Sequence, residues 1–471
     1  MLRRHLPTIL LLALPACVHA APKDDPWHAK ARAILAHAVD VPTVAGRGRV
    51  PELAAWLADQ YRAAGIPAAD IQVLPYNETA ALVVRWRASG KPTAKPIMVM
   101  AHMDVVEARR EDWSATDPFV FTEKDGYYYG RGTSDIKNGI AATTAAILKL
   151  KAGGFKPARD IIVFYTGDEE TAGVGAQLGA TKWHDLLDVE YGLNADGGRG
   201  GFAPDGRALG FTLQAAEKTY ANYTFTTHNR GGHSSKPRAD NAIYQLANAL
   251  HRLETYRFEP VQNEVTRAYF AGREKTESGP LGNAMRAWLR NPADGAAADA
   301  IEADEGEAGL TRTRCVATTL AGGHALNALP QTATANINCR IMPGVSPDAI
   351  RDELERVAAD KGVAVARADK EVASLASPLR ADIMEAHAAA VHALHPGVPV
   401  LPEMSAGASD ARPFRVAGIP VYGVDGAWRV VPADLRAHGR DERLPVKALD
   451  DDVEHWALLL GRLAGEKKAA P

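Results

Sequence analysis

Continuous apolar runs alternate with amphipathic segments of helical length over residues 29–213, and this alternation constrains the fold more than any other feature of the chain. Strands that are apolar on both faces are typical of parallel sheets, because helices cover such sheets on both sides. The apolar runs are Pro96–His102, Asp160–Thr166 and Tyr191–Ala195, and the helical segments are Pro51–Gly65 and Asn138–Ala152. The sequence therefore predicts an α/β fold with a mostly parallel sheet.

A second pattern begins near residue 214 and indicates an inserted α+β domain. Its segments follow the order β-α-β-β-α-β, which is the ferredoxin-like arrangement. They are residues 221–227, 241–253, 315–320, 332–341, 347–360 and 363–368. The α/β pattern resumes after about residue 374 and ends in a helix. The expected divisions are a leader at 1–20, a first main segment at 21–213, the inserted domain at 214–370 and a second main segment at 371–471.

The inserted domain contains a long polar insertion at about residues 255–312, for which the sequence indicates no role. Its acidic tract at 294–307 is predicted to be a solvated helix or loop. Cys315 and Cys339 lie in two strand-like runs of the same domain. They would form a disulfide if those strands are neighbours, but two buried free thiols fit the sequence equally well.

The first 20 residues have the pattern of a secretory signal peptide. Arg3 and Arg4 precede an apolar run at 6–15 that is too short to span a bilayer, and Val18 and Ala20 are small residues at the −3 and −1 positions of a cleavage site before Ala21. We therefore expect a secreted or periplasmic protein. A lipoprotein anchored through Cys17 is the alternative.

Composition narrows the range of partners. The 471 residues are 46% hydrophobic and 24% charged, as in ordinary soluble proteins of two or three domains. Lys and Arg number 54 against 57 Asp and Glu, so the formal net charge is −3. Because no basic surplus is present to neutralise phosphates, the composition argues against a nucleic-acid partner, and it excludes a multi-span membrane chain.

Histidine and acidic side chains recur where the expected strands end. They are His102 and Asp104 after the first run, Glu169 and Glu170 after the second, Asp196 after the third, and Asp135 just before a helix. In open α/β sheets, ligands bind beyond the carboxyl ends of the strands, so we expect these groups to converge. Imidazole and carboxylate groups suit zinc, and five of them would make a two-metal site: His102, Asp135, Glu170, Asp196 and the distant His438.

Three of the acidic residues would have specific chemical tasks in such a site. Asp135 could bridge two ions about 3.5–4 Å apart. Asp104 could accept the second ring N–H of His102, and Glu169 could take a proton from an attacking water. A single acidic residue at a strand end is usually solvated at the surface, and a single histidine is usually a side chain with ordinary hydrogen-bond partners. The recurrence of such residues at one edge of the sheet instead favours a functional site.

Several segments resemble the motifs of the M20 family of metallopeptidases, which includes aminoacylases, glutamate carboxypeptidases and succinyl-diaminopimelate desuccinylases. The segments are Met100–Val106, Gly130–Lys137, Gly167–Glu170 and Ala437–Glu442. A further one, Trp113–Phe119, is similar to the carboxypeptidase S and N-acyl-amino-acid hydrolase branch. The resemblance implies a zinc-hydrolase catalytic domain with an inserted lid or dimerisation domain. It also implies two zinc ions, although cobalt and manganese suit the same ligands.

The resemblance also implies a role for each site residue. His102 and Asp196 would bind one zinc, Glu170 and His438 the other, and Asp135 would bridge them. Glu169 would be the general base and Asp104 would orient His102. Asp196 stands where many relatives have glutamate. Relatives have a cis peptide after the bridging aspartate, which here is the Asp135–Ile136 bond.

Four further residues would act on the substrate. His233, within Gly231–Ser235, would reach the active site of a partner subunit and stabilise the oxyanion. Asn327 and Arg340 would hold the substrate carboxylate, a task that suits the two-pronged guanidinium. Gly407 would line the substrate loop and let its backbone approach closely. A homodimer formed through the inserted domain follows from these roles.

The expected function is that of a secreted metallo-carboxypeptidase, which hydrolyses the amide bond next to the C-terminal, free-carboxylate amino acid of a peptide by means of a metal-activated water. An N-acyl-amino-acid deacylase on the same fold is the alternative. A non-catalytic metal-dependent binding protein is a third reading, against which the intact Glu169 argues. The sequence has no His-Glu-x-x-His helix, Gly-x-Ser-x-Gly elbow or phosphate-binding loop to suggest other chemistry.

Overall fold

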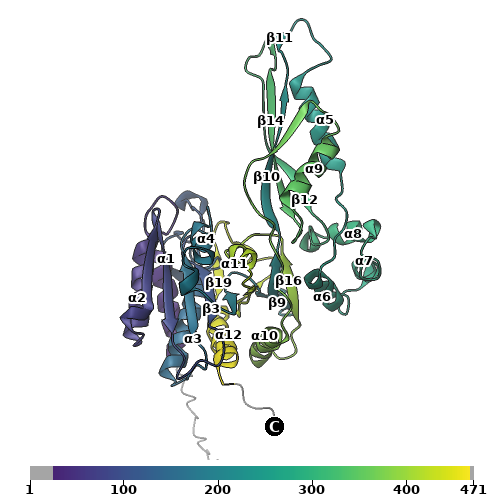
Figure 1. The fold of residues 1–471 in the computed structure, drawn as a ribbon. Coiled ribbons are helices and arrows are strands. Elements are labelled where there is room, and N and C mark those ends of the chain that lie inside the picture. The colour runs from purple at the N-terminus through teal and green to yellow at the C-terminus, as the bar shows by residue number, and fades with distance from the viewer. Residues whose placement is uncertain (1–24, 467–471) are drawn as a thin grey trace, which may run out of the picture.

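The computed structural model describes residues 25–466. The expectations for a signal peptide at 1–20 and an anchor at Cys17 lie outside the described residues. Figure 1 shows a broad α/β part and a narrower α+β part that projects from it. Within residues 25–466, no helix is long and apolar enough to cross a membrane.

The α/β part is built on a ten-stranded sheet with a parallel centre. β3 (Ile97–His102) lies between β6 (Ile161–Thr166) and β7 (Tyr191–Asn194) and runs parallel to both. β17 (Val421–Gly423) is parallel to β7 on its other side. The full order is β1-β2-β6-β3-β7-β17-β9-β8-β18, with β16 paired to β9. Antiparallel pairs such as β1–β2 and β8–β9 lie toward the edges, so the predicted mainly parallel α/β sheet is confirmed.

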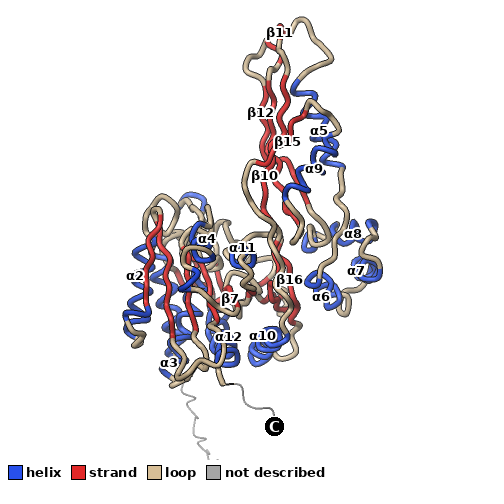
Figure 2. Tube along the Cα trace, viewed as in Figure 1, coloured by secondary structure: helices blue, strands red, loops and turns tan. Residues whose placement is uncertain are grey.

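The packing of β3 explains its unbroken apolar sequence. Ile97 and Val99 belong to the core formed with α1, α3 and α12, whereas Met98 and Met100 pack on the opposite face with residues of α4 and α11. Figure 2 shows the strands of this sheet flanked by helices. The bounds of these helices are α1 (Pro26–Asp40), α3 (Lys137–Ala152), α4 (Val174–Ala180), α11 (Ala411–Val416) and α12 (Val446–Ala464). A strand that is covered on both faces needs an apolar residue at every position.

The other elements of this part complete the sheet and its cover. They are α2 (Val50–Ala63), α10 (Ala381–Leu394), β1 (Ile71–Tyr76), β2 (Thr79–Trp86), β8 (Gly200–Phe202), β9 (Ala208–Glu217), β16 (Val400–Ser405) and β18 (Trp428–Val430). A separate three-stranded sheet consists of β4 (Thr122–Lys124), β5 (Tyr127–Tyr129) and β19 (Arg443–Pro445).

The projecting part is a four-stranded antiparallel sheet with the order β12-β14-β10-β15. Its six elements follow the predicted β-α-β-β-α-β sequence, and α5 and α9 pack on the sheet through a core of their own. At the far end in Figure 1, β11 (Gly232–His233) pairs with β13 (Ala328–Leu329). The six elements are β10 (Thr219–His228), α5 (Ala242–Thr255), β12 (Arg314–Gly322), β14 (Thr332–Ile341), α9 (Pro347–Ala358) and β15 (Val363–Arg367).

The insertion within this domain differs from its prediction. It forms α6 (Glu264–Arg273), α7 (Gly279–Arg290) and α8 (Gly295–Glu302), which share a small apolar core. The expectation of a solvated acidic tract was wrong for two of its residues. Glu302 and Glu307 are buried, because Arg314 pairs with the first carboxylate at 2.9 Å and Arg273 pairs with the second at 3.0 Å.

Cys315 and Cys339 form a disulfide. They occupy directly opposite positions on the neighbouring strands β12 and β14. Of the two possibilities that the sequence left open, the structure has the paired one.

Candidate active site

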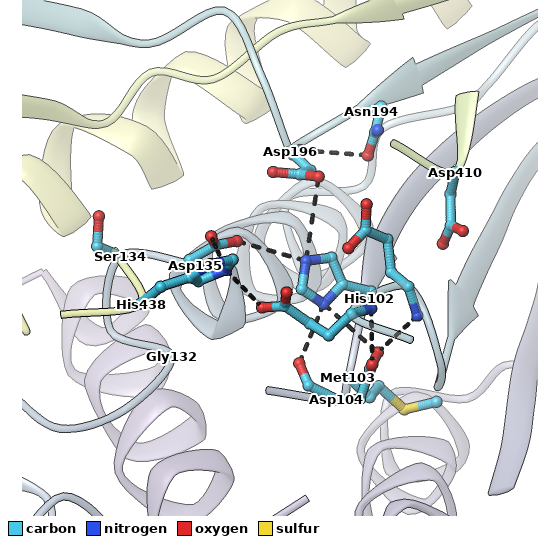
Figure 3. Close-up of polar contacts among 12 residues, drawn as sticks. His102, Met103, Asp104, Gly132, Ser134, Asp135, Asn194, Asp196, Asp410 and His438 are labelled. Atoms are coloured by element: carbon cyan, nitrogen blue, oxygen red, sulfur yellow. Dashed lines mark hydrogen bonds and ion pairs between the residues drawn. The ribbon is translucent and has the colours of Figure 1, made fainter. Parts of the chain in front are cut away.

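The predicted metal ligands converge at the carboxyl edge of the parallel strands. His102 is the last residue of β3, Glu170 follows β6, and Asp196 follows β7. Asp135 precedes α3, and His438 comes from the loop after β18. Because β6, β3 and β7 are parallel neighbours, their ends deliver these side chains to one place (Figure 3).

Asp135 lies between the two histidines. Its Oδ1 is 3.4 Å from Nε2 of His102, and its Oδ2 is 3.2 Å from Nε2 of His438. His438 also contacts Oε1 of Glu170 at 3.0 Å, and Asp196 lies 4.0 Å from Nε2 of His102. Each oxygen of Asp135 therefore faces one histidine, and each histidine faces a second carboxylate.

These residues fit a pair of divalent cations. Nε2 of His102 is buried and has no hydrogen-bond partner among the described residues, although it points at carboxylates. The ligand atoms of His102, Asp135 and Glu170 all lie within 4.8 Å of one another. Imidazole and carboxylate are the donors that zinc uses in hydrolytic sites. The expected ligands thus lie close together, and the buried Nε2 of His102 among them has no hydrogen-bond partner in the described residues.

The electrostatics of the cluster also favour cations. Burial raises the pKa of Asp196 to about 6, and the neighbouring Asp135 adds to this rise. Hydrogen bonds that His438 donates to the carboxylates of Asp135 and Glu170 raise its pKa to about 10. Buried carboxylates crowded in this way hold protons more tightly than exposed ones, and a divalent cation would compensate the same negative charges.

Asp104 supports the cluster in a different way from the one expected. Nδ1 of His102 contacts the backbone carbonyl of Asp104 at 3.0 Å, whereas the Asp104 carboxylate is 3.5 Å away. That carboxylate instead accepts hydrogen bonds from the backbone N–H groups of Glu169 (3.1 Å) and Glu170 (3.0 Å). Asp104 thus fixes both the imidazole and the turn that carries the two glutamates.

Glu169 lies beside the ligand cluster. Burial raises the pKa of its carboxyl well above the usual range, and the negative charges of Asp196, Asp410 and Glu170 add to the rise against the opposing charge of His102. A cavity of about 450 Å³ contains Glu169 and Glu170 together with His438, Arg340 and Gly407. The expected base, two of the five expected metal ligands and two expected substrate residues therefore share one cavity.

Two buried carboxyl groups support the site without having been singled out in the sequence. Glu442 accepts hydrogen bonds from the backbone of Gly132, Ser134 and Asp135 at 2.8–3.1 Å and pairs with Arg131 at 2.7 Å. It thereby holds the loop that presents Asp135. The expected cis peptide bond between Asp135 and Ile136 is present in this loop.

Asp410 is the second of these groups. It accepts a hydrogen bond from the hydroxyl of Thr166, at the end of β6. Burial raises the pKa of Asp410 to about 7. Glu442 lies in a segment whose motif was recognised, and Asp410 lies three residues after the expected substrate residue Gly407, but their roles depend on partners that are hundreds of residues away in the chain.

His233 and Asn327 do not join the cluster. They lie on the exposed far end of the inserted domain, where the Asn327 carbonyl accepts a hydrogen bond from the backbone N–H of Ser234 at 3.0 Å. Neither residue is among those that line the 450 Å³ cavity. A single copy of the described chain therefore brings Arg340 and Gly407, but not His233 and Asn327, to the ligands.

Comparisons with known proteins agree with this geometry. Residues 98–462 match the model of peptidase family M20/M25/M40. N-fatty-acyl-amino acid synthase/hydrolase PM20D1 of Homo sapiens is 28% identical over 386 residues, covering 77% of this chain and 73% of that protein. Aminoacylase-1 of Homo sapiens is 27% identical over 424 residues, covering 87% and 89%. The metallo-carboxypeptidase Sso-CP2 of Sulfolobus solfataricus has the same fold, with a TM-score of 0.68 at 17% identity over 92% of this chain and 99% of that one.

A histidine and carboxylate cluster at the carboxyl edge of an α/β sheet defines the class of metal-dependent hydrolases. The family match, which covers most of the chain, is more specific. The chain belongs to peptidase family M20 and is a metal-dependent hydrolase of that family, as the sequence motifs predicted.

Proposed function

We propose that this enzyme holds two zinc ions and cleaves the amide bond next to an amino acid with a free carboxylate. The observation that carries the proposal is the shared cavity, in which Glu169 and the ligands Glu170 and His438 face the same space as Arg340. Peptides and N-acyl amino acids both contain such a bond. A carboxypeptidase and a deacylase are therefore the two candidate activities, and the deacylase is favoured by the N-fatty-acyl-amino acid relative and by aminoacylase-1.

The ligands divide between two ions. His102 and Asp196 would hold one, Glu170 and His438 would hold the other, and Asp135 would contact both. When bound, the ions would polarise the amide carbonyl and favour ionisation of a water molecule. Cobalt or manganese would suit the same donors.

The remaining steps belong to side chains. Glu169 accepts a proton from the attacking water and returns it to the amine nitrogen as the C–N bond breaks. Its buried position makes it a stronger base than an exposed glutamate. Arg340, which stacks 4.7 Å from the ring centroid of Tyr220 and donates to the carbonyl of Ala406, binds the substrate carboxylate beside Gly407.

The active enzyme is a homodimer in this proposal. His233 and Asn327 lie outside their own cavity, so a partner subunit supplies the oxyanion donor and the second carboxylate contact. β12 is an edge strand of its sheet, and Val316 (60% exposed) and Leu320 (68% exposed) on it are open to solvent. An edge strand with exposed apolar side chains is suited to pairing with a second copy.

Export of the protein is a further part of the proposal. The leader at 1–20 supports it, and so does the Cys315–Cys339 disulfide, since disulfides persist in oxidising compartments. Fractionation of cells followed by mass spectrometry of the mature N-terminus tests it. A lipid on Cys17 would show the anchored alternative, and a retained leader in the cytosol would contradict export.

Metal removal and a substrate panel test the activity. We expect chelation to abolish hydrolysis and added zinc to restore it, because the ligands contribute nothing to catalysis without the ions. Elemental analysis should give two metal ions per chain. The panel contains C-terminal dipeptides, N-acetyl amino acids and the matching amino acid amides, which lack the carboxylate. Hydrolysis of the amides as fast as the acids, or of no amide bond by the loaded protein, would contradict the proposal.

A further inference from the structure

A buried glutamate lies where the chain passes from the α/β part into the inserted domain. Glu217 is the last residue of β9, and only Lys218 separates β9 from β10, the first strand of the inserted domain. Glu217 is 0% exposed. Burial raises the pKa of its carboxyl, whereas the charge of Arg415 and a hydrogen bond from Ser409 oppose this rise. Because a carboxyl group is costly to bury, the groups that it binds indicate what it does.

The Glu217 carboxylate binds the cavity loop, which consists of residues 405–410. Its Oε2 accepts a hydrogen bond of 2.7 Å from the hydroxyl of Ser409. The same hydroxyl oxygen accepts a hydrogen bond of 3.2 Å from the backbone N–H of Ala411, the first residue of α11. Arg415 lies 3.4 Å from Oε2 and compensates its charge. Ser409 therefore connects the end of β9 to the start of α11.

Two further contacts join the cavity loop to the junction of the two domains. The backbone N–H of Lys218 donates to the carbonyl of Ser405 at 3.0 Å. Arg340, on β14 of the inserted domain, donates to the carbonyl of Ala406 at 3.4 Å. Residues 406–410 belong to no helix or strand, so individual contacts of this kind set the position of the loop.

The position of the cavity loop matters because residues 407–410 line the active-site cavity of 450 Å³. Residues 406–408 are exposed and carry at most a methyl group, so their side chains offer little packing. Asp410, which follows Ser409, is buried and accepts a hydrogen bond from Thr166. The bond from Ser409 to Glu217 thus anchors the loop at the end of its exposed stretch. A hydrogen bond to a charged acceptor is roughly twice as strong as one between neutral groups.

We propose that Glu217 is a positioning residue, which holds the cavity loop where it lines the active site. The inference rests on the proposed function, in which the loop meets the amino acid part of the substrate beside Arg340 and Gly407. Glu217 touches neither the substrate nor the reacting atoms, and it acts through Ser409. Without this anchor the loop samples other positions, and the substrate binds less tightly.

Two substitutions in the full-length, zinc-loaded protein weaken the anchor from either side. Ser409→Ala deletes the hydroxyl, and Glu217→Gln keeps the shape of the side chain but replaces the charged acceptor with a neutral one. For the best substrate of the panel, we expect kcat/KM to fall about tenfold for Ser409→Ala and about threefold for Glu217→Gln. Most of the change should appear in KM, because the loop binds substrate and transfers no proton.

Glu307→Gln is the matched control. Glu307 is also a buried glutamate, is paired with Arg273 at 3.0 Å, and is not among the residues that line the cavity. Its replacement repeats the loss of a buried charge without touching the loop, so KM and kcat should stay at their wild-type values.

A double-mutant cycle separates positioning from direct contact between Ser409 and the substrate. If Ser409 acts through Glu217, Ser409→Ala should lower kcat/KM clearly less in the Glu217→Gln background than in the wild type. Effects that simply multiply would show that Ser409 acts on the substrate by itself, and they would overturn the proposal. If Glu217→Gln does not fold, Ser409→Ala alone tests the anchor by its KM and by the exchange measurement below.

Hydrogen exchange gives a readout that does not depend on turnover. The peptide that covers residues 405–410 should exchange faster in Ser409→Ala and in Glu217→Gln but not in Glu307→Gln, because only the first two loosen the anchor. Wild-type exchange of this peptide in both loop variants, with or without a loss of thermal stability, would reduce Glu217 to a structural residue and overturn the proposal. A loaded protein that hydrolyses no member of the panel contradicts the proposed function, whereas the exchange of the loop still decides whether Glu217 anchors it.

Discussion

At the scale of single residues, the site illustrates how position along a strand predicts chemistry. His102 ends a buried parallel strand, and Glu170 and Asp196 follow the ends of its two neighbours. Parallel strands end at one edge, so the convergence of these residues follows from the sequence. Glu442 and Asp410 could not be found in this way. Their functions depend on distant partners, the loop at 130–135 and Thr166, and no local pattern reports such contacts.

Glu169→Gln tests the general base. The amide cannot accept a proton, so we expect kcat to fall about 10²–10⁴-fold while two metal ions remain bound. Steady-state kinetics and elemental analysis of the same preparation measure both quantities. Glu385→Gln on the exposed face of α10 is the control and should leave kcat unchanged. Loss of the metal together with the activity would instead make Glu169 a ligand.

At the scale of elements, the strands were easier to predict than the insertion. The apolar alternation of β3 with its neighbours is a local signal, whereas α6, α7 and α8 each bury one narrow face in a polar sequence. Glu302 and Glu307 were expected in solvent because an acidic run usually is solvated. Only the fold reveals that Arg314 and Arg273 lie beside them.

The contact between α10 and α12 makes stability depend on pH. Nδ1 of His387 lies 2.9 Å from Nε2 of His455, and burial lowers the pKa of His387 to about 4 and that of His455 well below its usual value. Unfolded histidines take up protons below about pH 6.5. As the pH falls from 6.5 towards 4, the free energy of unfolding should therefore decrease by up to about 1.4 kcal/mol per unit for each histidine.

Urea unfolding between pH 7.5 and 4.5 measures this dependence. His455→Gln removes one of the two titrating groups and should make the slope shallower, whatever it does to stability at pH 7.5. His251→Gln is the control, because this histidine is 75% exposed on α5. An unchanged slope for the His455 variant would show that other groups cause the acid sensitivity.

At the scale of the whole molecule, the proposed dimer would complete the active site, because His233 and Asn327 lie outside the cavity of their own chain. Mixing two inactive variants, His233→Ala and Glu169→Gln, tests this directly. A mixed dimer has one cavity with an intact base and an intact partner histidine. After random exchange, half of the dimers are mixed, so about a quarter of the wild-type activity should appear.

Ultracentrifugation of each variant provides the control that both still form dimers, and activity is measured before and after exchange of subunits. A mixture that stays inactive, although mixed dimers are present, would show that His233 does not complete the cavity of its partner.

The sequence predicted the inserted domain but not the direction in which this domain projects from the α/β part. That direction depends on how β9 continues into β10, for which the sequence has no local signal.

The distance of His233 and Asn327 from their own cavity has a kinetic consequence. In the proposed dimer, a newly made copy has its base and its metal ligands but is inert until it encounters another. At concentrations below the dissociation constant, the rate of hydrolysis would rise with the square of the amount of enzyme. If the enzyme is exported as proposed, dilution in the outside volume would by itself lower its activity, and its action would be confined to the neighbourhood of the cell that made it.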